Sequence, residues 1–291
     1  TGLSTGIDHR YRKWISNYGQ SYGEWAEPAD VKDFAISEFV CPHPEETTAY
    51  IVLLMERMSE IAALLGKYSE AARYTDFGNK VREGYQHLME APKFSLDTDR
   101  QAKLVRPLHL DLLTGQQAEY AQKRLLQALD NYGWRLGTGF LSTPFILDVL
   151  TKMDVEYAYR LLENEELPGW LCMPKQGATT IWENWEGPNT HKPASLNHYS
   201  KGAVCRWVFD SMCGIHVDRE NHFIIAPRPG GHFSHAKASY RSIYGLVESG
   251  WEKAEAGFVF TVTVPANCTA AVFLPGGQEL AQESGTQVYT V

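Results

Sequence analysis

The chain has 291 residues, of which 44% are hydrophobic, so it can bury one large domain or a large domain with a smaller one attached. Its formal net charge of −8 argues against a nucleic-acid partner, and it contains no run of eighteen apolar residues that could cross a membrane. The start, TGLSTGIDHRYRKW, has neither the apolar core of a secretory leader nor an initiating Met. The chain can thus be processed or cut from something longer, and periplasmic, secreted and cytoplasmic locations all stay open.

Cysteine and histidine residues give no sign of a metal or cofactor. The cysteines are scattered, odd in number and without a CxxC pair, which indicates buried thiols rather than a disulfide or zinc framework. They are Cys41, Cys172, Cys205, Cys213 and Cys268. His43, His232 and His235 lack a convincing third ligand, and no phosphate-binding glycine loop is present. We therefore expect no metal and no cofactor.

Residues 46–213 show the apolar periodicity of helices. The first predicted helix, 47–66, carries an i, i+3, i+4 stripe and ends at Gly66. The stripe consists of Ile51, Leu54, Met55, Met58, Ile61, Ala62 and Leu65. Further helices are predicted over 71–88, 116–133, 144–152 with Thr143 as cap, 155–166 capped by Asp154, and 195–214.

After residue 217 the pattern alternates with period two, which predicts strands separated by turn residues. One of these strands would place Phe258, Phe260, Val262 and Val264 on a single face. The fold class is thus mainly α with a β appendage, with a helical domain over 1–216 and a small antiparallel β-sandwich over 217–291. Trp207 and Trp251 would lie in the cores of these two parts.

The loops between the predicted helices alternate between short ones and long ones that are rich in Gly, Pro and Trp. This alternation favours part or all of an (α/α)6 toroid, in which long loops at one end build a funnel. A generic helical bundle fits the periodicity equally well, so both architectures stay open at this point.

The stretch TTIWENWEGPN places Glu183 between Trp182 and Trp185, next to a Gly-Pro-Asn turn. A carboxylate among indole rings is either a glutamate on a Trp-rich surface or part of a site that binds something flat-faced and polar. Trp25 and Trp134 also lie in predicted loops, where an indole ring could stack on the C–H face of a sugar. For any one of these rings, core packing is the competing hypothesis.

Several segments together resemble the bacterial and fungal α-L-rhamnosidases. They are YGEW (22–25), DRQAKLV (99–105), TGFLSTPFILDVL (138–150), GATTIWENWEG (177–187), LNHYSKGAV (196–204), and IIAPRPGG followed by ASYRSIYGLVESGWE. Their order and spacing match along nearly the whole chain. The resemblance implies an (α/α)6 barrel followed by a β-sandwich, and inverting hydrolysis of terminal α-L-rhamnosyl groups.

The resemblance also implies roles for individual residues. Glu183 would be the general base that activates water, and His198 in NHYSKG would contact the sugar, as would Trp25, Trp134, Trp182 and Trp185. The partner would be a carbohydrate, with neither nucleic acid nor membrane involved. The family's general acid lies in an upstream Asp-Glu-Arg-type motif that this chain does not contain.

Two hypotheses therefore stay open, a rhamnosidase of which this chain is the C-terminal part and a non-catalytic carbohydrate-binding relative on the same fold. In either case we expect the first barrel helices to be absent, and a homodimer or association with the N-terminal part would cover the apolar helix faces left exposed.

Further acidic residues are given structural rather than catalytic roles. Glu24, Glu27, Asp30 and Asp33 are predicted to form a solvated loop, although one of them could pair with Glu183. The family more often has Asp where Glu24 stands. The segment LDTDRQAK is predicted to be a helix start with an ion pair of its own.

Overall fold

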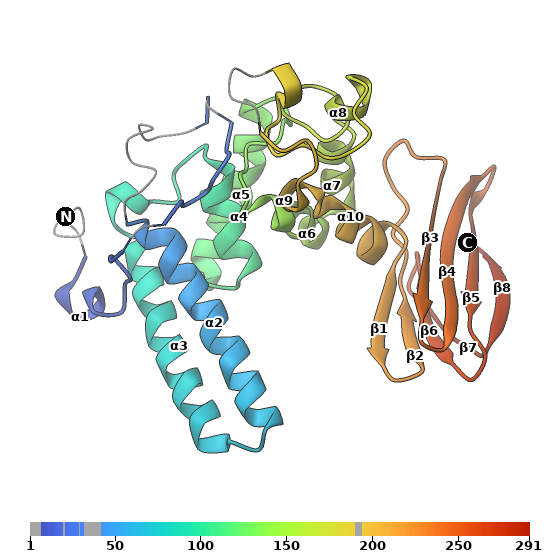
Figure 1. Cartoon of the computed structure of the whole chain (residues 1–291), viewed down its shortest axis with the longest axis horizontal. Coiled ribbons are helices and arrows are strands. Elements are labelled where there is room, and N and C mark those ends of the chain that lie inside the picture. Colours follow the sequence, from blue (N-terminus) through green and yellow to red (C-terminus); the bar gives the residue numbers. More distant parts are fainter. Residues whose placement is uncertain (1–6, 20, 29, 32–41, 190–193) are drawn as a thin grey trace. The chain divides into compact units, whose positions relative to one another are not determined.

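The computed structural model describes residues 7–19, 21–28, 30–31, 42–189 and 194–291. The chain divides into two compact units, one made of Thr1–Val149 and Asn164–Lys201, the other of Leu150–Glu163 and Gly202–Val291. Figure 1 shows that helices dominate the first unit and strands the second. None of the described helices combines the length and apolarity that a membrane span requires.

Helices of the first unit agree with most of the predicted ones. They are α1 (His9–Arg12), α2 (Pro44–Leu64), α3 (Tyr68–Leu88), η2 (Pro92–Phe94), α4 (Gln101–His109), α5 (Gly115–Asn131), α6 (Thr143–Met153), which continues into the second unit, α8 (Cys172–Lys175), η3 (Gly187–Asn189) and α9 (Tyr199–Gly202). The short helices α1 and α8 were not predicted, because four residues are too few to show a helical period.

Helices α2 and α3 form a hairpin, and they lie side by side in Figure 1. Gly66 turns the chain between them with a φ of 70°, as its predicted role as a stop requires. The apolar stripe predicted for α2 is only partly covered, because Leu54, Ile61 and Leu65 are between 51% and 66% exposed. Burial is concentrated instead near the start of α2, at Ala49 and Val52.

Helices α4 and α5 follow each other directly in the chain and pack against each other. A capping box at Thr114 and Gln117 starts α5, and its end at Asn131 precedes Gly133, which has a φ of 66°. The sequence indicated only the start of α4. Pro107 interrupts its hydrogen-bond ladder, yet Leu104 and Val105 are fully buried, so packing maintains the helix.

The helical part of the second unit is α7 (Val155–Leu162), α10 (Val204–Trp207) and the π-helix η4 (Val208–Met212). Asp154 caps α7 as predicted and accepts the Glu156 N–H at 2.9 Å. The single helix predicted over 195–214 is wrong at its start. Ser195 to His198 are not helical, because their backbone bonds a neighbouring loop.

The strands form two four-stranded sheets. The strands are β1 (Ile215–Arg219), β2 (His222–Ile225), β3 (His235–Ser242), β4 (Gly245–Ala254), β5 (Gly257–Val264), β6 (Thr269–Leu274), β7 (Gln278–Gln282) and β8 (Gly285–Thr290). The strand orders are β1-β2-β6-β7 and β3-β4-β5-β8. The predicted antiparallel arrangement is confirmed with one exception, since β2 and β6 pair in parallel.

The sandwich core comes from alternate residues of the central strands. Phe260, Val262 and Val264 of β5 are buried as predicted, whereas Phe258 is only half-buried. Gln282 of β7 donates to the Val262 carbonyl at 3.1 Å and so ties one sheet to the other.

The remaining predictions of burial are largely confirmed. Trp207 and Trp251 are almost fully buried. Cys172, Cys213 and Cys268 are buried free thiols, whereas Cys205 is exposed, which corrects the prediction for that residue. Cys41 lies outside the described residues.

Candidate functional site

Two loop segments of the first unit run beside each other and carry Glu183 and His198. The Glu183 N–H donates to the Ser195 carbonyl at 2.9 Å, and the His198 N–H donates to the Ile181 carbonyl at 2.8 Å. The Thr180 hydroxyl bonds the Leu196 carbonyl of the same segment. The backbone pairing therefore brings the predicted base and the predicted sugar-contacting histidine onto adjacent segments.

The Glu183 side chain is half-buried and held at one oxygen. Its Oε2 accepts the Ser195 N–H at 3.0 Å, which completes a reciprocal pair of bonds between the two residues. Among the described residues no other donor reaches this carboxylate. One oxygen is thus oriented by the backbone, and the other has no donor within the described residues, which would allow it to accept a proton from a water molecule.

The ring of His198 lies in an aromatic stack. It packs against Phe140 with a centroid separation of 4.6 Å and against Tyr199 with one of 5.0 Å. Its Nδ1 is 3.3 Å from the Ser200 N–H and accepts from it, so the neutral ring carries its proton on Nε2. Nε2–H can therefore donate to a hydroxyl oxygen.

Trp182 and Trp185 lie beneath the loop, with exposed fractions of 5% and 2%. Gly187 covers the Trp182 ring so closely that a Cβ there would fall 2.0 Å from Cε3, and its φ of 54° also requires glycine. The Lys201 ammonium lies 4.1 Å from the centre of the Trp185 ring. Among the described residues Trp185 Nε1–H, although buried, has no hydrogen-bond acceptor.

Trp25 and Trp134 have different surroundings. Trp25 is half-buried and meets the ring of Tyr22 edge-on at 5.3 Å, and Tyr22 is 64% exposed. Trp134 is placed by helix α5 instead. It is 5% exposed, and its Nε1–H donates to Asp130 at 2.6 Å. Trp25 is thus half-buried, whereas Trp134 is enclosed.

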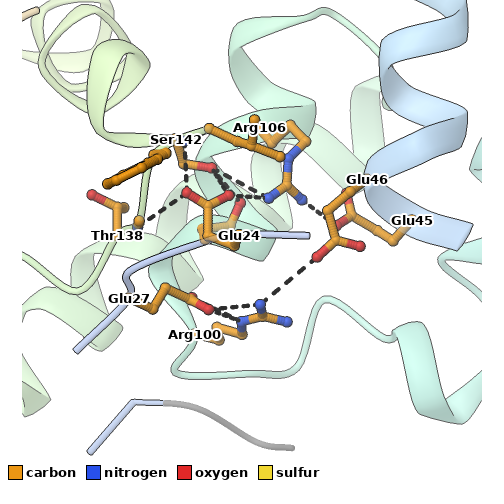
Figure 2. Close-up of polar contacts among 12 residues, drawn as sticks. Glu24, Glu27, Glu45, Glu46, Arg100, Arg106, Thr138 and Ser142 are labelled. Carbon is orange, nitrogen blue, oxygen red and sulfur yellow. Dashed lines mark hydrogen bonds and ion pairs between the residues drawn. The ribbon is translucent and has the colours of Figure 1, made fainter. Parts of the chain in front are cut away.

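A buried ionic cluster contains Glu24, the residue that precedes Trp25 in the chain, and Figure 2 shows its members. The Glu24 carboxylate is fully buried and accepts from Gly139 N–H at 3.0 Å, Ser142 N–H at 2.7 Å and the Ser142 hydroxyl at 2.8 Å. The Arg106 guanidinium bonds it as well and joins it to Glu45 of α2. Glu24 is therefore tied to α4 and, through Arg106, to α2.

A second buried pair, Glu27 with Arg100, follows in the same loop. The Arg100 Nε and Nη2 donate to the two Glu27 oxygens at 2.8 and 2.7 Å. Burial raises the pKa of Glu27 to about 7, although the guanidiniums of Arg100 and Arg106 favour its charged form. Burial also raises the pKa of Glu45, against the attraction of Arg106.

These positions correct the prediction of a solvated acidic loop. Glu24 and Glu27 are buried because arginines from α4 and its start compensate their charges, whereas Asp30 is exposed and accepts the Tyr132 hydroxyl at 2.7 Å. Asp33 lies outside the described residues. The acidic residues of the segment LDTDRQAK pair with Arg124 rather than with Arg100. The partners lie 73 and 82 positions away in the chain, so no local pattern could reveal them.

Elsewhere in the first unit a cavity of about 420 Å³ lies between Trp14 and the α2–α3 hairpin. None of the predicted site residues lines it. Within the described ranges, no three His, Cys, Asp or Glu side chains are arranged to hold a metal ion.

Comparisons with known proteins identify both parts of the chain. Residues 3–212 match the family model of the bacterial alpha-L-rhamnosidase 6 hairpin glycosidase domain, and residues 221–288 match that of the bacterial alpha-L-rhamnosidase C-terminal domain. The alpha-L-rhamnosidase of Streptomyces avermitilis is 34% identical over 263 residues, and that of Formosa agariphila is 31% identical over 291. The alignments cover 87% and 91% of this chain but 24% and 30% of those proteins.

Solved structures agree with these matches. The S. avermitilis α-L-rhamnosidase complexed with L-rhamnose superposes with a TM-score of 0.82 and 30% identity, covering 96% of this chain and 29% of that one. The Aspergillus terreus α-L-rhamnosidase gives a TM-score of 0.82 at 27% identity, with 93% and 33% covered. This chain thus spans about a quarter to a third of the length of these relatives. It belongs to the bacterial α-L-rhamnosidase family of six-hairpin glycosidases, which confirms the resemblance and the predicted helical domain with a β-sandwich.

Proposed function

We propose that this chain supplies the general base and part of the sugar-binding surface of an inverting α-L-rhamnosidase. Glu183 would remove a proton from the water that attacks the anomeric carbon, while a carboxylic acid outside the matched segments would protonate the leaving oxygen. The observation that carries the proposal is the backbone pairing of the Glu183 and His198 segments. Within the part of the chain that the structure describes, this pairing leaves one carboxylate oxygen and one imidazole N–H for a ligand.

The sugar contacts are proposed according to how each side chain is placed. His198 Nε2–H would donate to a rhamnose hydroxyl, and the half-buried Trp25 ring would pack on the sugar ring. Trp182 and Trp185 would form the floor, and the unused Nε1–H of Trp185 would donate to a bound hydroxyl or water. Trp134 has its N–H bonded and its ring enclosed, so we assign it to packing around α5.

The test compares two glutamates of one loop. Hydrolysis of p-nitrophenyl α-L-rhamnoside is measured in the longer protein that also supplies the general acid. The wild type is compared with Glu183→Gln and with Glu186→Gln, whose side chain is exposed. Removing a general base is expected to lower kcat by roughly 10²- to 10⁴-fold, while the Glu186 variant stays within a few-fold of wild type. NMR of the first-formed product should show inverted, β-configured rhamnose.

Addition of azide gives a second test, because a small anion can attack in place of the activated water. Glu183→Ala should release β-L-rhamnosyl azide in the presence of sodium azide, and wild type should not. If the wild-type protein is active and Glu183→Gln hydrolyses the substrate at the same rate, Glu183 is not the general base. A wild-type protein that binds L-rhamnose in calorimetry but hydrolyses nothing supports the alternative, a non-catalytic carbohydrate-binding relative.

A further inference from the structure

We infer that Glu24 is a positioning residue, which fixes Trp25 and His198 in the sugar-binding surface through the turn of residues 139–142. The inference rests on the proposed function for the meaning of that surface. It does not make Glu24 a partner of Glu183 in proton transfer. All of the contacts involved lie within the first unit.

The Glu24 carboxylate is saturated with hydrogen bonds. Oε1 accepts two backbone N–H groups, from Gly139 and Ser142, and Oε2 accepts the Ser142 hydroxyl and Arg106 Nη2. A carboxylate has about four acceptor positions, so all of them are used. The side chain is 0% exposed. Glu24 therefore cannot serve as an acid or base for a bound sugar, and its chemistry is that of a tether.

The turn held by Glu24 is bonded directly to Trp25. The Phe140 N–H donates to the Trp25 carbonyl at 2.8 Å, so the turn and the Trp25 segment hold each other directly. Gly139 makes this approach feasible, because a Cβ there would lie 2.3 Å from the Trp25 carbonyl oxygen. With Glu24 bonded to both ends of the turn, the backbone beside Trp25 has little freedom to move.

The same turn also contacts the His198 segment. The ring of Phe140 stacks on the His198 ring, and the Phe140 carbonyl accepts the Ser200 hydroxyl at 3.1 Å. The same turn therefore contacts both predicted sugar-binding residues, one through its backbone and the other mainly through a side chain. If the turn moves, Trp25 and His198 lose a common support.

Glu27 provides a matched control within the same loop. It is also a buried glutamate paired with an arginine of the α4 region. Among the described residues, however, only Arg100 donates to its carboxylate, so Glu27 has no bond to the turn of residues 139–142. A purely structural role would make the two glutamates equivalent, whereas a positioning role separates them.

The experiment compares Glu24→Gln with Glu27→Gln at a temperature below the first unfolding transition of each. With Glu183 untouched, Glu24→Gln should raise KM for the rhamnoside by roughly ten- to a hundredfold and change kcat much less, because binding groups are displaced. Glu27→Gln should leave KM within about twofold. Equal effects of the two variants on KM would overturn the inference.

A spectroscopic measurement makes the result independent of activity. The protein is labelled with 5-fluorotryptophan, and the Trp25 signal is assigned by its loss in Trp25→Phe. Glu24→Gln should shift or broaden this ¹⁹F signal in the sugar-free protein, and Glu27→Gln should not. If Glu24→Gln does not fold, Ser142→Ala removes only one of the four bonds and should move the signal in the same direction.

The outcomes separate this inference from the proposed function. A wild-type protein that neither binds nor hydrolyses rhamnosides refutes the proposed function, while the fluorine signal still decides whether Glu24 positions Trp25. An unchanged Trp25 signal in folded Glu24→Gln and Ser142→Ala refutes the positioning role, whatever the activity is.

Discussion

Replacing Arg106 by Met should destabilise the first unit more than any change at an exposed ion pair. Arg106 is fully buried and bonds both Glu24 and Glu45, which are also buried. Removing one partner of a buried pair leaves an uncompensated charge and costs about 3–5 kcal/mol. Glu24 keeps three other donors and Glu45 keeps the Tyr85 hydroxyl at 2.5 Å, so we expect a value within this range rather than the sum of two pairs.

The loss should also depend on pH with a defined sign. Burial raises the pKa of Glu45 in the folded protein, and removal of the guanidinium takes away the nearby charge that lowers it, so this pKa lies above that in the unfolded chain. Such groups favour folding at low pH, and their contribution is lost as pH rises through the folded pKa. Each proton involved changes stability by about 1.4 kcal/mol per pH unit, so Arg106→Met should be less destabilised at pH 5.5 than at pH 8.

Urea unfolding followed by circular dichroism at both pH values measures the effect. The control is Arg124→Met, because Arg124 pairs with Asp97 and Asp99, which are 74% and 56% exposed, and such pairs contribute at most about 1 kcal/mol. If Arg106→Met costs no more than this control, or costs the same at both pH values, the view of the cluster as a charge-compensated core is wrong.

Three further predictions concern other parts of the chain. Because burial raises the pKa of Glu27 from 4.5 to about 7, its contribution to stability is largest below pH 4.5 and is lost as pH rises through 7, by about 3 kcal/mol in total. Glu27→Gln should therefore flatten the fall of the melting temperature between pH 5 and pH 8. Gly187→Ala forces a Cβ against the Trp182 ring at a φ of 54° and should cost about 1–3 kcal/mol, and it should raise KM for the rhamnoside. Trp251→Phe removes a 2.8 Å bond to the Met212 carbonyl and should cost about 1–3 kcal/mol in the second unit.

Each of these predictions has a result that contradicts it. The prediction for Glu27 is wrong if the wild-type melting temperature does not fall between pH 5 and pH 8. It is also wrong if the melting temperature of Glu27→Gln falls as much as that of the wild type. If Gly187→Ala has the melting temperature of the wild type, the loop accommodates the added Cβ without loss of stability. In calorimetry, Trp251→Phe should lower the temperature of one unfolding transition only, that of the second unit. The control Val288→Ala truncates a 62% exposed side chain of β8 and should shift neither transition by a comparable amount.

Features of the fold that depend on residues close together in the chain could be predicted from the sequence. The helical periods of α2, α3 and α5, the stops at Gly66 and Gly133 and the Asp154 cap are local features, and the structure has them. Thr143, predicted as a cap, is instead the first residue of α6. The alternation that placed Phe260 and Val262 inside the sandwich is local as well. What local patterns could not reveal was which apolar stripes are covered, as the exposure of one face of α2 shows.

The candidate site shows the same division between local and distant effects. The loop around Glu183 could be singled out because a carboxylate between indoles is unusual in itself. The burial of Glu24 could not be predicted, since its compensating charge is 82 residues away and its other donors are 115 and 118 residues away. Trp134 illustrates the reverse case, because its loop position suggested a sugar contact while an acceptor only four residues away, Asp130, holds its ring inside.

The parallel pairing of β2 with β6 has a consequence for how the sandwich forms during synthesis. His222 and Thr269, the first pair of this ladder, are 47 residues apart, so the inner edge of the β1–β2 hairpin has no partner until three intervening strands have emerged. Until then Phe223 and Ile225 lack their neighbouring strand, and an open strand edge with apolar side chains is prone to aggregate. A chain that ends after β5 would therefore keep the edge of β2 open, whereas a chain that ends after β7 has every strand of the first sheet.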